Sequence, residues 1–209
     1  TGGLAIAVVI SCMFFGAVSG SSPATVVAIG ALMLPALVEM GYDEKFSLGL
    51  ITSSSAVAVI IPPSIGMIVY GSVTGVSVGE LFMAGIGPGI LYGLTFMLYC
   101  YYYAKKNNIK QIEDPSERTG LWEAFKDAGW ALGIPVVIIV GIYGGFFTPT
   151  EAAAVAAVYA IIVSMFIYKE LTWKDLIDES IESAIGTAQV MILLAAASVF
   201  SWILTRQQA

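Results

Sequence analysis

Residues 1–38 carry no charged side chain, yet the polar run SGSSPAT, residues 19–25, lies at their centre. As one straight helix, residues 4–38 would be roughly 52 Å long, whereas the hydrocarbon core of a bilayer is roughly 30 Å thick. Two full crossings would need about 40 residues plus a turn. The length therefore predicts a re-entrant helical hairpin with residues 19–25 at its tip. Because irregular backbone is not tolerated against lipid, such a tip must be buried in protein or line a watery cavity, where channels and transporters hold their solutes.

Composition extends the membrane interpretation to the whole chain. Hydrophobic residues make up 58% of the 209 residues, charged residues make up 11%, and the mean hydropathy is +0.87. Soluble domains carry about 25% charged residues, so we expect an all-α, multi-pass integral membrane protein in contact with the lipid bilayer. No basic patch interleaved with aromatic residues indicates a nucleic-acid partner. The uncharged stretches, most of them long enough to span, are residues 1–38, 46–79, 81–104, 128–150, 152–168 and 183–205.

The basic residues predict the orientation of the chain. Residues 105–126 hold five of the nine lysines and arginines, so the positive-inside rule places this segment in the cytoplasm. Two spans, at about 128–147 and 150–168, then return the chain to Lys169 and Lys174 on the same side. Counting backwards, the hairpin enters the membrane from the cytoplasm.

Helix starts are indicated by capping boxes at residues 77–80 and 148–151, the second with Pro149 at the first helical position. We interpret Glu151 as a helix cap near the interface rather than as a proton carrier. Residues 172–183 have an apolar stripe opposite acidic residues, which predicts an interfacial helix. The stripe consists of Trp173, Leu176, Ile177 and Ile181.

A second interruption is predicted in residues 51–71, ITSSSAVAVIIPPSIGMIVYG. Pro62 and Pro63 lack the backbone N–H and disturb the preceding turn, so we expect a helix that ends near Ile60 and restarts around Ser64. Such a break frees carbonyl groups, which suit a hard cation, and N–H groups, which suit a carboxylate. The simpler interpretations are a plain proline kink, and serines that serve packing or bond back to the preceding turn. Together with the polar hairpin, the break favours a binding role.

Small residues indicate close helix contacts at two places. Gly85, Gly89 and Gly93 form consecutive GxxxG steps, and Gly141 with Gly145 forms another. Because lipid provides no hydrophobic drive for helix association, such faces let helices approach closely.

Missing residue types exclude several function classes. The sequence has no histidine, and no predicted span has a charged residue in its interior. A proton relay therefore lacks titrating groups, and a Ser–His protease lacks its base, so we expect no enzyme and no catalytic residue. A bound cation would rest on neutral oxygens, which favours sodium as the coupling ion, and no other cofactor is expected. Cys12 and Cys100 lie inside apolar runs and are interpreted as packing residues rather than a disulfide.

Residues 19–43, 51–71 and 144–160 closely resemble the DctM-like large membrane subunit of the tripartite ATP-independent periplasmic (TRAP) transporters. The likeness covers essentially the whole chain, which we interpret as an internal segment of a longer protein. The resemblance implies a secondary transporter of the bacterial or archaeal inner membrane that imports organic acids, of dicarboxylate or sialic-acid type, with a sodium gradient. It also implies an elevator-type fold with inverted repeats, of which this chain holds the first hairpin and the first broken helix. The implied partners are a small membrane subunit and a periplasmic substrate-binding protein that delivers the solute.

The resemblance maps the sodium site onto the hairpin tip and the break, that is, onto Ser19, Gly20, Ser21, Ser22, Pro62, Pro63 and Ser64. We place the organic acid on neighbouring hydroxyl groups, those of Ser21, Ser22, Thr25, Ser54 and Ser55. The chain is divided into residues 1–103, part of the transport domain, residues 104–127, a cytoplasmic loop, and residues 128–209. This last part holds further spans, the interfacial helix at 172–183 and the start of a second repeat.

Two other classes stay open. A pore-forming channel subunit also uses a re-entrant loop with serine and carbonyl oxygens, and it would show non-saturating flux that needs no gradient coupling. A non-transporting membrane scaffold would explain the glycine faces, but not a polar tip together with a double-proline break.

Overall fold

The computed structural model describes residues 2–109 and 121–207, with the backbone alone for residues 121–128. These residues form helices joined by turns, and no strand is found among them. They divide into two compact units, of which the first ends at Val158 and the second begins at Tyr159. The all-α prediction is confirmed.

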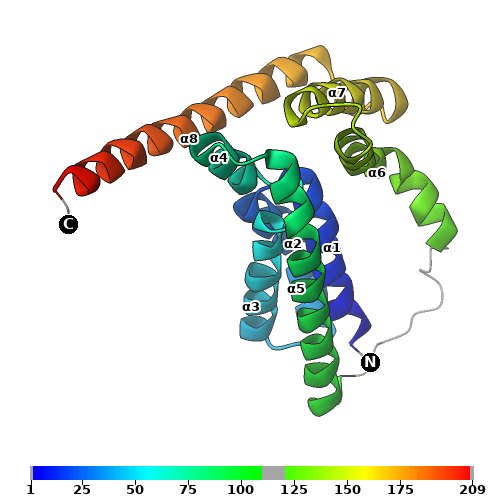
Figure 1. Cartoon of the computed structure of the whole chain (residues 1–209). Helices are drawn as coiled ribbons and strands as arrows, with labels where there is room; N and C mark the ends of the chain where they lie inside the picture. The colour runs from blue at the N-terminus through cyan, green and yellow to red at the C-terminus, as the bar shows by residue number, and fades with distance from the viewer. Residues whose placement is uncertain (1, 110–120, 208–209) are drawn as a thin grey trace. The chain divides into compact units, whose positions relative to one another are not determined.

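The first two helices form a hairpin. Helix α1 (Gly3–Ser19) and helix α2 (Ser22–Glu39) are joined through Gly20 and Ser21 and pack against each other (Figure 1). At 1.5 Å per residue each helix is about 26 Å long, close to the thickness of a hydrocarbon core. Gly20 closes α1 with a φ of 61°, and its N–H donates to the Gly16 carbonyl oxygen at 2.8 Å.

The broken helix is present as the sequence predicts. Helix α3 (Glu44–Ser55) tightens into a 3₁₀ turn, η1 (Ala56–Val59), and helix α4 (Ile65–Thr74) begins after Ser64. Pro62 and Pro63 lie in the gap and are joined by a cis peptide bond. The predicted end near Ile60 and restart around Ser64 are both confirmed.

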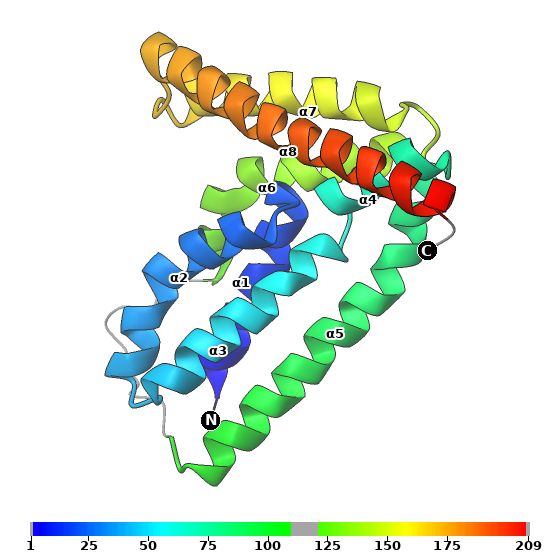
Figure 2. The same cartoon turned by 90° about the vertical axis from the view of Figure 1, so that its left-hand side faces the viewer.

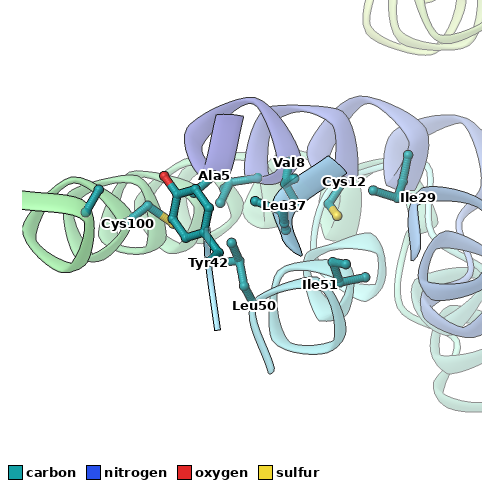
Figure 3. Close-up of a cluster of buried hydrophobic side chains, with 11 residues drawn as sticks. Ala5, Val8, Cys12, Ile29, Leu37, Tyr42, Leu50, Ile51 and Cys100 are labelled. Carbon is teal, nitrogen blue, oxygen red and sulfur yellow. The ribbon is translucent and has the colours of Figure 1, made fainter. Parts of the chain in front are cut away.

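Helix α1 is the centre of the first unit. Ala5, Val8, Val9, Cys12 and Gly16 recur at helical spacing and are all buried. Helices α2 and α3 and the long helix α5 (Val78–Lys106) pack around α1, as Figure 2 shows. These helices and the connection between α2 and α3 complete the core, which Figure 3 shows with Ile29, Leu37, Tyr42, Leu50, Ile51 and Cys100, and which also contains Ala104. Both cysteines are therefore core residues, as the sequence predicts.

Two helices follow α5 along the chain. Helix α6 (Leu121–Tyr143) begins inside the segment assigned to the cytoplasmic loop, and helix α7 (Pro149–Ile162) continues as a π-helical turn, η3 (Val163–Ile167). At the start of α7 the Thr148 N–H donates to the Glu151 carboxylate at 2.8 Å, and the Glu151 N–H donates to the Thr148 hydroxyl at 3.3 Å. This reciprocal pair confirms the cap assigned to Glu151.

The helix-packing interpretation of Gly145 is wrong. Helix α6 ends at Tyr143, and Gly145 lies in the following turn with a φ of 72°, which an L residue adopts only with strain. A Cβ at Gly141 would lie 2.6 Å from the ring of Phe147, which is also in this connection. The GxxxG spacing here therefore reflects a tight turn rather than a helix–helix face.

The second unit contains one long helix, α8 (Trp173–Gln207). The structure joins residues 173–183 to the apolar residues that follow in one helix, whereas the sequence predicts an interfacial helix at residues 172–183. None of the described residues of α8 is buried. By length and composition, four of the described helices can cross a membrane: Ser22–Glu39, Val78–Lys106, Pro149–Ile167 and Trp173–Gln207. The chain is accordingly a multi-pass membrane protein.

Candidate ion and solute site

The hairpin tip packs directly against the helix break. The Ile65 N–H donates to the Gly20 carbonyl oxygen at 3.3 Å, which links the first residue of α4 to the turn between α1 and α2. Gly20 is buried, and a Cβ at this position would lie 3.0 Å from the Pro63 carbonyl oxygen. The structure thus brings together the two interruptions that lie far apart in the sequence.

Helix ends of both polarities meet at this contact. Helix α1 ends at Ser19 and the 3₁₀ turn at Val59, while α2 begins at Ser22 and α4 at Ile65. The final carbonyl groups of a helix carry partial negative charge and suit a cation, whereas the first N–H groups suit an anion. One small region therefore offers both kinds of group without any charged side chain.

The hydroxyl groups of the tip form a local network. Thr25, which is fully buried, donates from Oγ1 to the Ser21 carbonyl oxygen at 2.8 Å. The Ser19 hydroxyl lies 3.2 Å from Thr25 Oγ1 and accepts the Ser21 N–H at 3.3 Å. Ser19, Ser21 and Ser22 are half-buried. The network holds the turn on either side of Gly20, the residue that contacts the break.

At the break, Ser64 is fully buried and donates its hydroxyl proton to the Val59 carbonyl oxygen at 2.8 Å. A hydroxyl has one proton and two acceptor lone pairs, so this bond leaves the lone pairs of Ser64 free to coordinate a cation. Pro62 is buried and Pro63 half-buried beside it. The bond also ties the start of α4 to the end of η1, across the gap.

Ser54 and Ser55 lie in the last turn of α3, and both are buried. Ser55 Oγ lies 3.6 Å from the Cys12 sulfur on α1, whereas Ser54 Oγ is buried without a hydrogen-bond partner in the described part of the chain. No hydrogen bond among the described residues joins either serine to the tip. Of the residues predicted to hold the solute, Ser54 is therefore the one whose unused hydroxyl calls for a further partner.

Sequence reasoning missed Tyr92. Its hydroxyl donates to the Ser53 carbonyl oxygen at 2.8 Å, which connects α5 to the end of α3. The signal was present in the spacing, because Tyr92 lies three residues after Gly89 and seven after Gly85, on the same side of a helix.

The site holds no titratable carboxylate or amine of its own, since residues 46–79 and 1–38 are uncharged. No group of three or more His, Cys, Asp or Glu side chains that could hold a metal occurs among the described residues. A cation would therefore be bound by carbonyl and hydroxyl oxygens, which are the ligands that hard cations prefer.

Comparison with known proteins places the chain in a family. Residues 1–209 match the model of the DctM component of tripartite ATP-independent periplasmic transporters. The chain is 46% identical over 211 residues to the ectoine TRAP transporter large permease protein TeaC of Halomonas elongata, covering 99% of the chain and 48% of that protein. It is 44% identical over 207 residues to the C4-dicarboxylate TRAP transporter large permease protein DctM of Pseudomonas aeruginosa, with coverage of 99% and 48%.

A third relative is the isethionate TRAP transporter permease protein DctMQ of Oleidesulfovibrio alaskensis. It is 45% identical over 208 residues, covering 99% of the chain and 33% of that protein. The chain thus spans a third to a half of the length of these curated relatives. With one family model matched from end to end, the chain belongs to the DctM component family of the tripartite ATP-independent periplasmic transporters.

Proposed function

We propose that this chain forms part of the translocation pathway of a sodium-coupled secondary transporter that imports organic acids. The observation that carries the proposal is the contact between Gly20 and Ile65, because it joins a polar hairpin tip to a broken helix. Each interruption leaves backbone groups outside a helical ladder. Leaving such groups without partners in an apolar medium costs several kcal/mol, on the order of 2–7 for an amide or hydroxyl, so a shared ligand that satisfies them stabilises the arrangement.

Sodium is the ion that these groups suit. Its ligands in this proposal come from the tip and the break, and Ser64 is the best supported because its donated proton leaves its lone pairs free. The absence of histidine from the sequence also argues against protons as the coupling ion. The proposed sodium-binding residues are Ser19, Gly20, Ser21, Ser22, Pro62, Pro63 and Ser64.

The proposed solute is an organic acid bound by hydroxyl groups and helix N-termini, with the sodium ion contributing positive potential. The relatives are named for different solutes, ectoine, isethionate and C4-dicarboxylates, so the family defines a class rather than one compound. The solute residues in this proposal are Ser21, Ser22, Thr25, Ser54 and Ser55. Family membership further supports a small membrane subunit and a periplasmic binding protein as partners, in a bacterial or archaeal inner membrane.

We further propose an elevator movement in which the tip and the break travel together with their ligands. The contact between the two interruptions supports such a rigid unit, since neither can move alone without losing the bond between Gly20 and Ile65. In this scheme the hairpin is re-entrant and residues 105–126 face the cytoplasm, in accord with their excess of basic residues.

Uptake into proteoliposomes tests the proposal. The complete transporter is reconstituted with its binding protein, and solute accumulation is measured under an inward sodium gradient or an inward proton gradient alone. We expect saturable accumulation with sodium and none with protons. Accumulation driven by a proton gradient without sodium would overturn the sodium coupling. Solute flux that neither saturates nor depends on an ion gradient would favour a channel.

A further inference from the structure

One face of α5 lies against the helix break. Gly85, Gly89 and Gly93 are buried and recur every four residues, whereas Gly87 is exposed and a Cβ there would meet nothing within 4 Å. The spacing of these glycines predicts close helix contacts. Their neighbours show a more specific arrangement.

Each glycine leaves room for a different group. A Cβ at Gly85 would collide with the Ile60 carbonyl oxygen and lie 2.5 Å from the end of the Met67 side chain, and one at Gly89 would collide with the Ile61 side chain. Ile60 and Ile61 are the two residues immediately before the prolines. Around Gly85 and Gly89, this face of α5 therefore leaves room for the non-helical segment that precedes the prolines.

The third glycine differs from the other two. A Cβ at Gly93 would collide with the thioether of Met13 on α1, which is the flexible end of a long side chain. Met13 also lines an apolar cavity of about 320 Å³ together with Phe14, Ala17, Ile61 and Met97. Met13 consequently has space into which it can move, unlike the backbone carbonyl opposite Gly85.

Helix α5 also contacts the chain before η1. Tyr92 donates to the Ser53 carbonyl oxygen at 2.8 Å, one residue before the buried and unpartnered Ser54 hydroxyl. The 3₁₀ turn and the proline gap have only short local hydrogen bonds in place of a continuous α-helical ladder, so contacts from other helices contribute to fixing their position. Helix α5 supplies such contacts both before η1, at Ser53, and after it, at Ile60.

We propose that Gly85 and Tyr92 are positioning residues for the ion site, acting through the backbone on either side of η1. The inference rests on the proposed sodium site and adds the element that sets its geometry. A displacement at Ile60 moves Pro63 and Ile65, which lie three and five residues further on and contact Gly20 at the hairpin tip. Ion affinity therefore depends on a glycine that does not itself contact the ion.

The test compares Gly85→Ala with Gly87→Ala in the complete transporter. Both changes add one methyl group to the same helix and gain the same helix propensity, so a general effect on α5 is shared. We expect Gly85→Ala to raise the half-saturating sodium concentration by roughly tenfold or more, as changes to groups that orient ligands do, and Gly87→Ala to stay within about twofold of the wild type. Gly93→Ala should lie between the two.

Tyr92→Phe provides a second variant that keeps the ring and removes only the hydroxyl. We expect it to raise the half-saturating sodium concentration by roughly 3- to 10-fold while the solute KM at saturating sodium and the melting temperature stay close to the wild type. If Gly85→Ala does not insert into the membrane, Tyr92→Phe decides the question.

The outcomes separate this inference from the proposed function. Unchanged sodium dependence in Tyr92→Phe, and in Gly85→Ala where it folds, would overturn the positioning role while leaving the sodium site intact. A wild-type transporter without any sodium dependence would overturn the proposed function and this inference with it.

Discussion

The hairpin tip and the helix break are both interruptions of helix, but they are held in different ways. The tip is supported from within, by hydrogen bonds among Ser19, Ser21 and Thr25. The break has short local bonds, from the Ser64 hydroxyl to Val59 and from the Ile60 and Ile61 N–H groups to the Val57 carbonyl oxygen, and it is surrounded by α1, α2 and α5. Gly20, which has a positive φ, forms the turn at the tip, whereas Pro62 and Pro63 interrupt the helix at the break.

This contrast indicates which substitutions each interruption is sensitive to. Changes inside the tip should act locally, because its network closes within seven residues, from Ser19 to Thr25. Changes at the break should act on ion binding from several elements at once. The place where the two supports depend on each other is the contact of Gly20 with Pro63 and Ile65.

The largest effect is expected from Gly20→Ala. The left-handed conformation costs an L residue about 1–2 kcal/mol, and the new Cβ would press on the Pro63 carbonyl oxygen 3.0 Å away. We expect loss of most uptake activity together with a lower melting temperature. Gly41→Ala is the control, since Gly41 has a φ of 86° but open space around a Cβ. Equal loss in both variants would show that backbone strain, rather than the contact between tip and break, causes the effect.

Ser64→Ala is expected to rank second. It removes a proposed ligand and leaves the Val59 carbonyl oxygen without its side-chain donor. Because interactions with charged groups contribute about 1.5–3 kcal/mol, we expect the half-saturating sodium concentration to rise by roughly tenfold or more. Ser72→Ala is the matched control on α4, where the exposed Ser72 hydroxyl bonds back to the Ile68 carbonyl oxygen at the same 2.8 Å. If both variants show the same sodium dependence, Ser64 has a purely structural role and is not a sodium ligand.

Thr25→Val should have a smaller and more local effect. The substitution keeps the shape of the side chain but removes the donor to the Ser21 carbonyl oxygen, which contributes about 1 kcal/mol to stability. We expect a modest drop in melting temperature and reduced uptake, with recovery in Thr25→Ser. Failure of the serine variant to recover would mean that the methyl group, not the hydroxyl network, supports the tip.

The smallest effect on stability is expected from Ser54→Ala, and its sign is informative. The Ser54 hydroxyl is buried without a partner, so its removal should leave stability unchanged or raise it by about 1 kcal/mol. If the solute supplies the missing partner, the solute KM should rise several-fold. Ser55→Ala serves for comparison, since Ser55 loses its contact with Cys12. A destabilised Ser54→Ala transporter with an unchanged KM would contradict the solute role.

Much of this arrangement follows from the sequence, for identifiable reasons. Two prolines and a Ser-Gly-Ser run are strong local signals, because they act through the backbone of the segment that contains them. The break at Pro62 and Pro63 and the cap at Glu151 could therefore be predicted. The prediction of a helix-packing face at Gly145 is wrong because a four-residue spacing does not show that the helix has already ended, at Tyr143.

Other features depend on tertiary contacts that no local pattern specifies. The bond from Tyr92 to Ser53 joins residues 39 positions apart, and the unpartnered state of Ser54 is a property of its whole surroundings. The seating of Ile60 against Gly85 likewise needs the packing of α5 on the break. The GxxxG pattern indicated a close approach at this face but not which group would fill it.

A double-mutant cycle tests most directly whether the tip and the break share one ion. Ser21→Ala, Ser64→Ala and the double variant are compared by their half-saturating sodium concentrations in the complete transporter. Two ligands of one ion should show a coupling of about 0.5–3 kcal/mol, so that the double variant is impaired less than the product of the single effects. Strictly multiplicative effects would show that the two serines act independently and would contradict a shared sodium site.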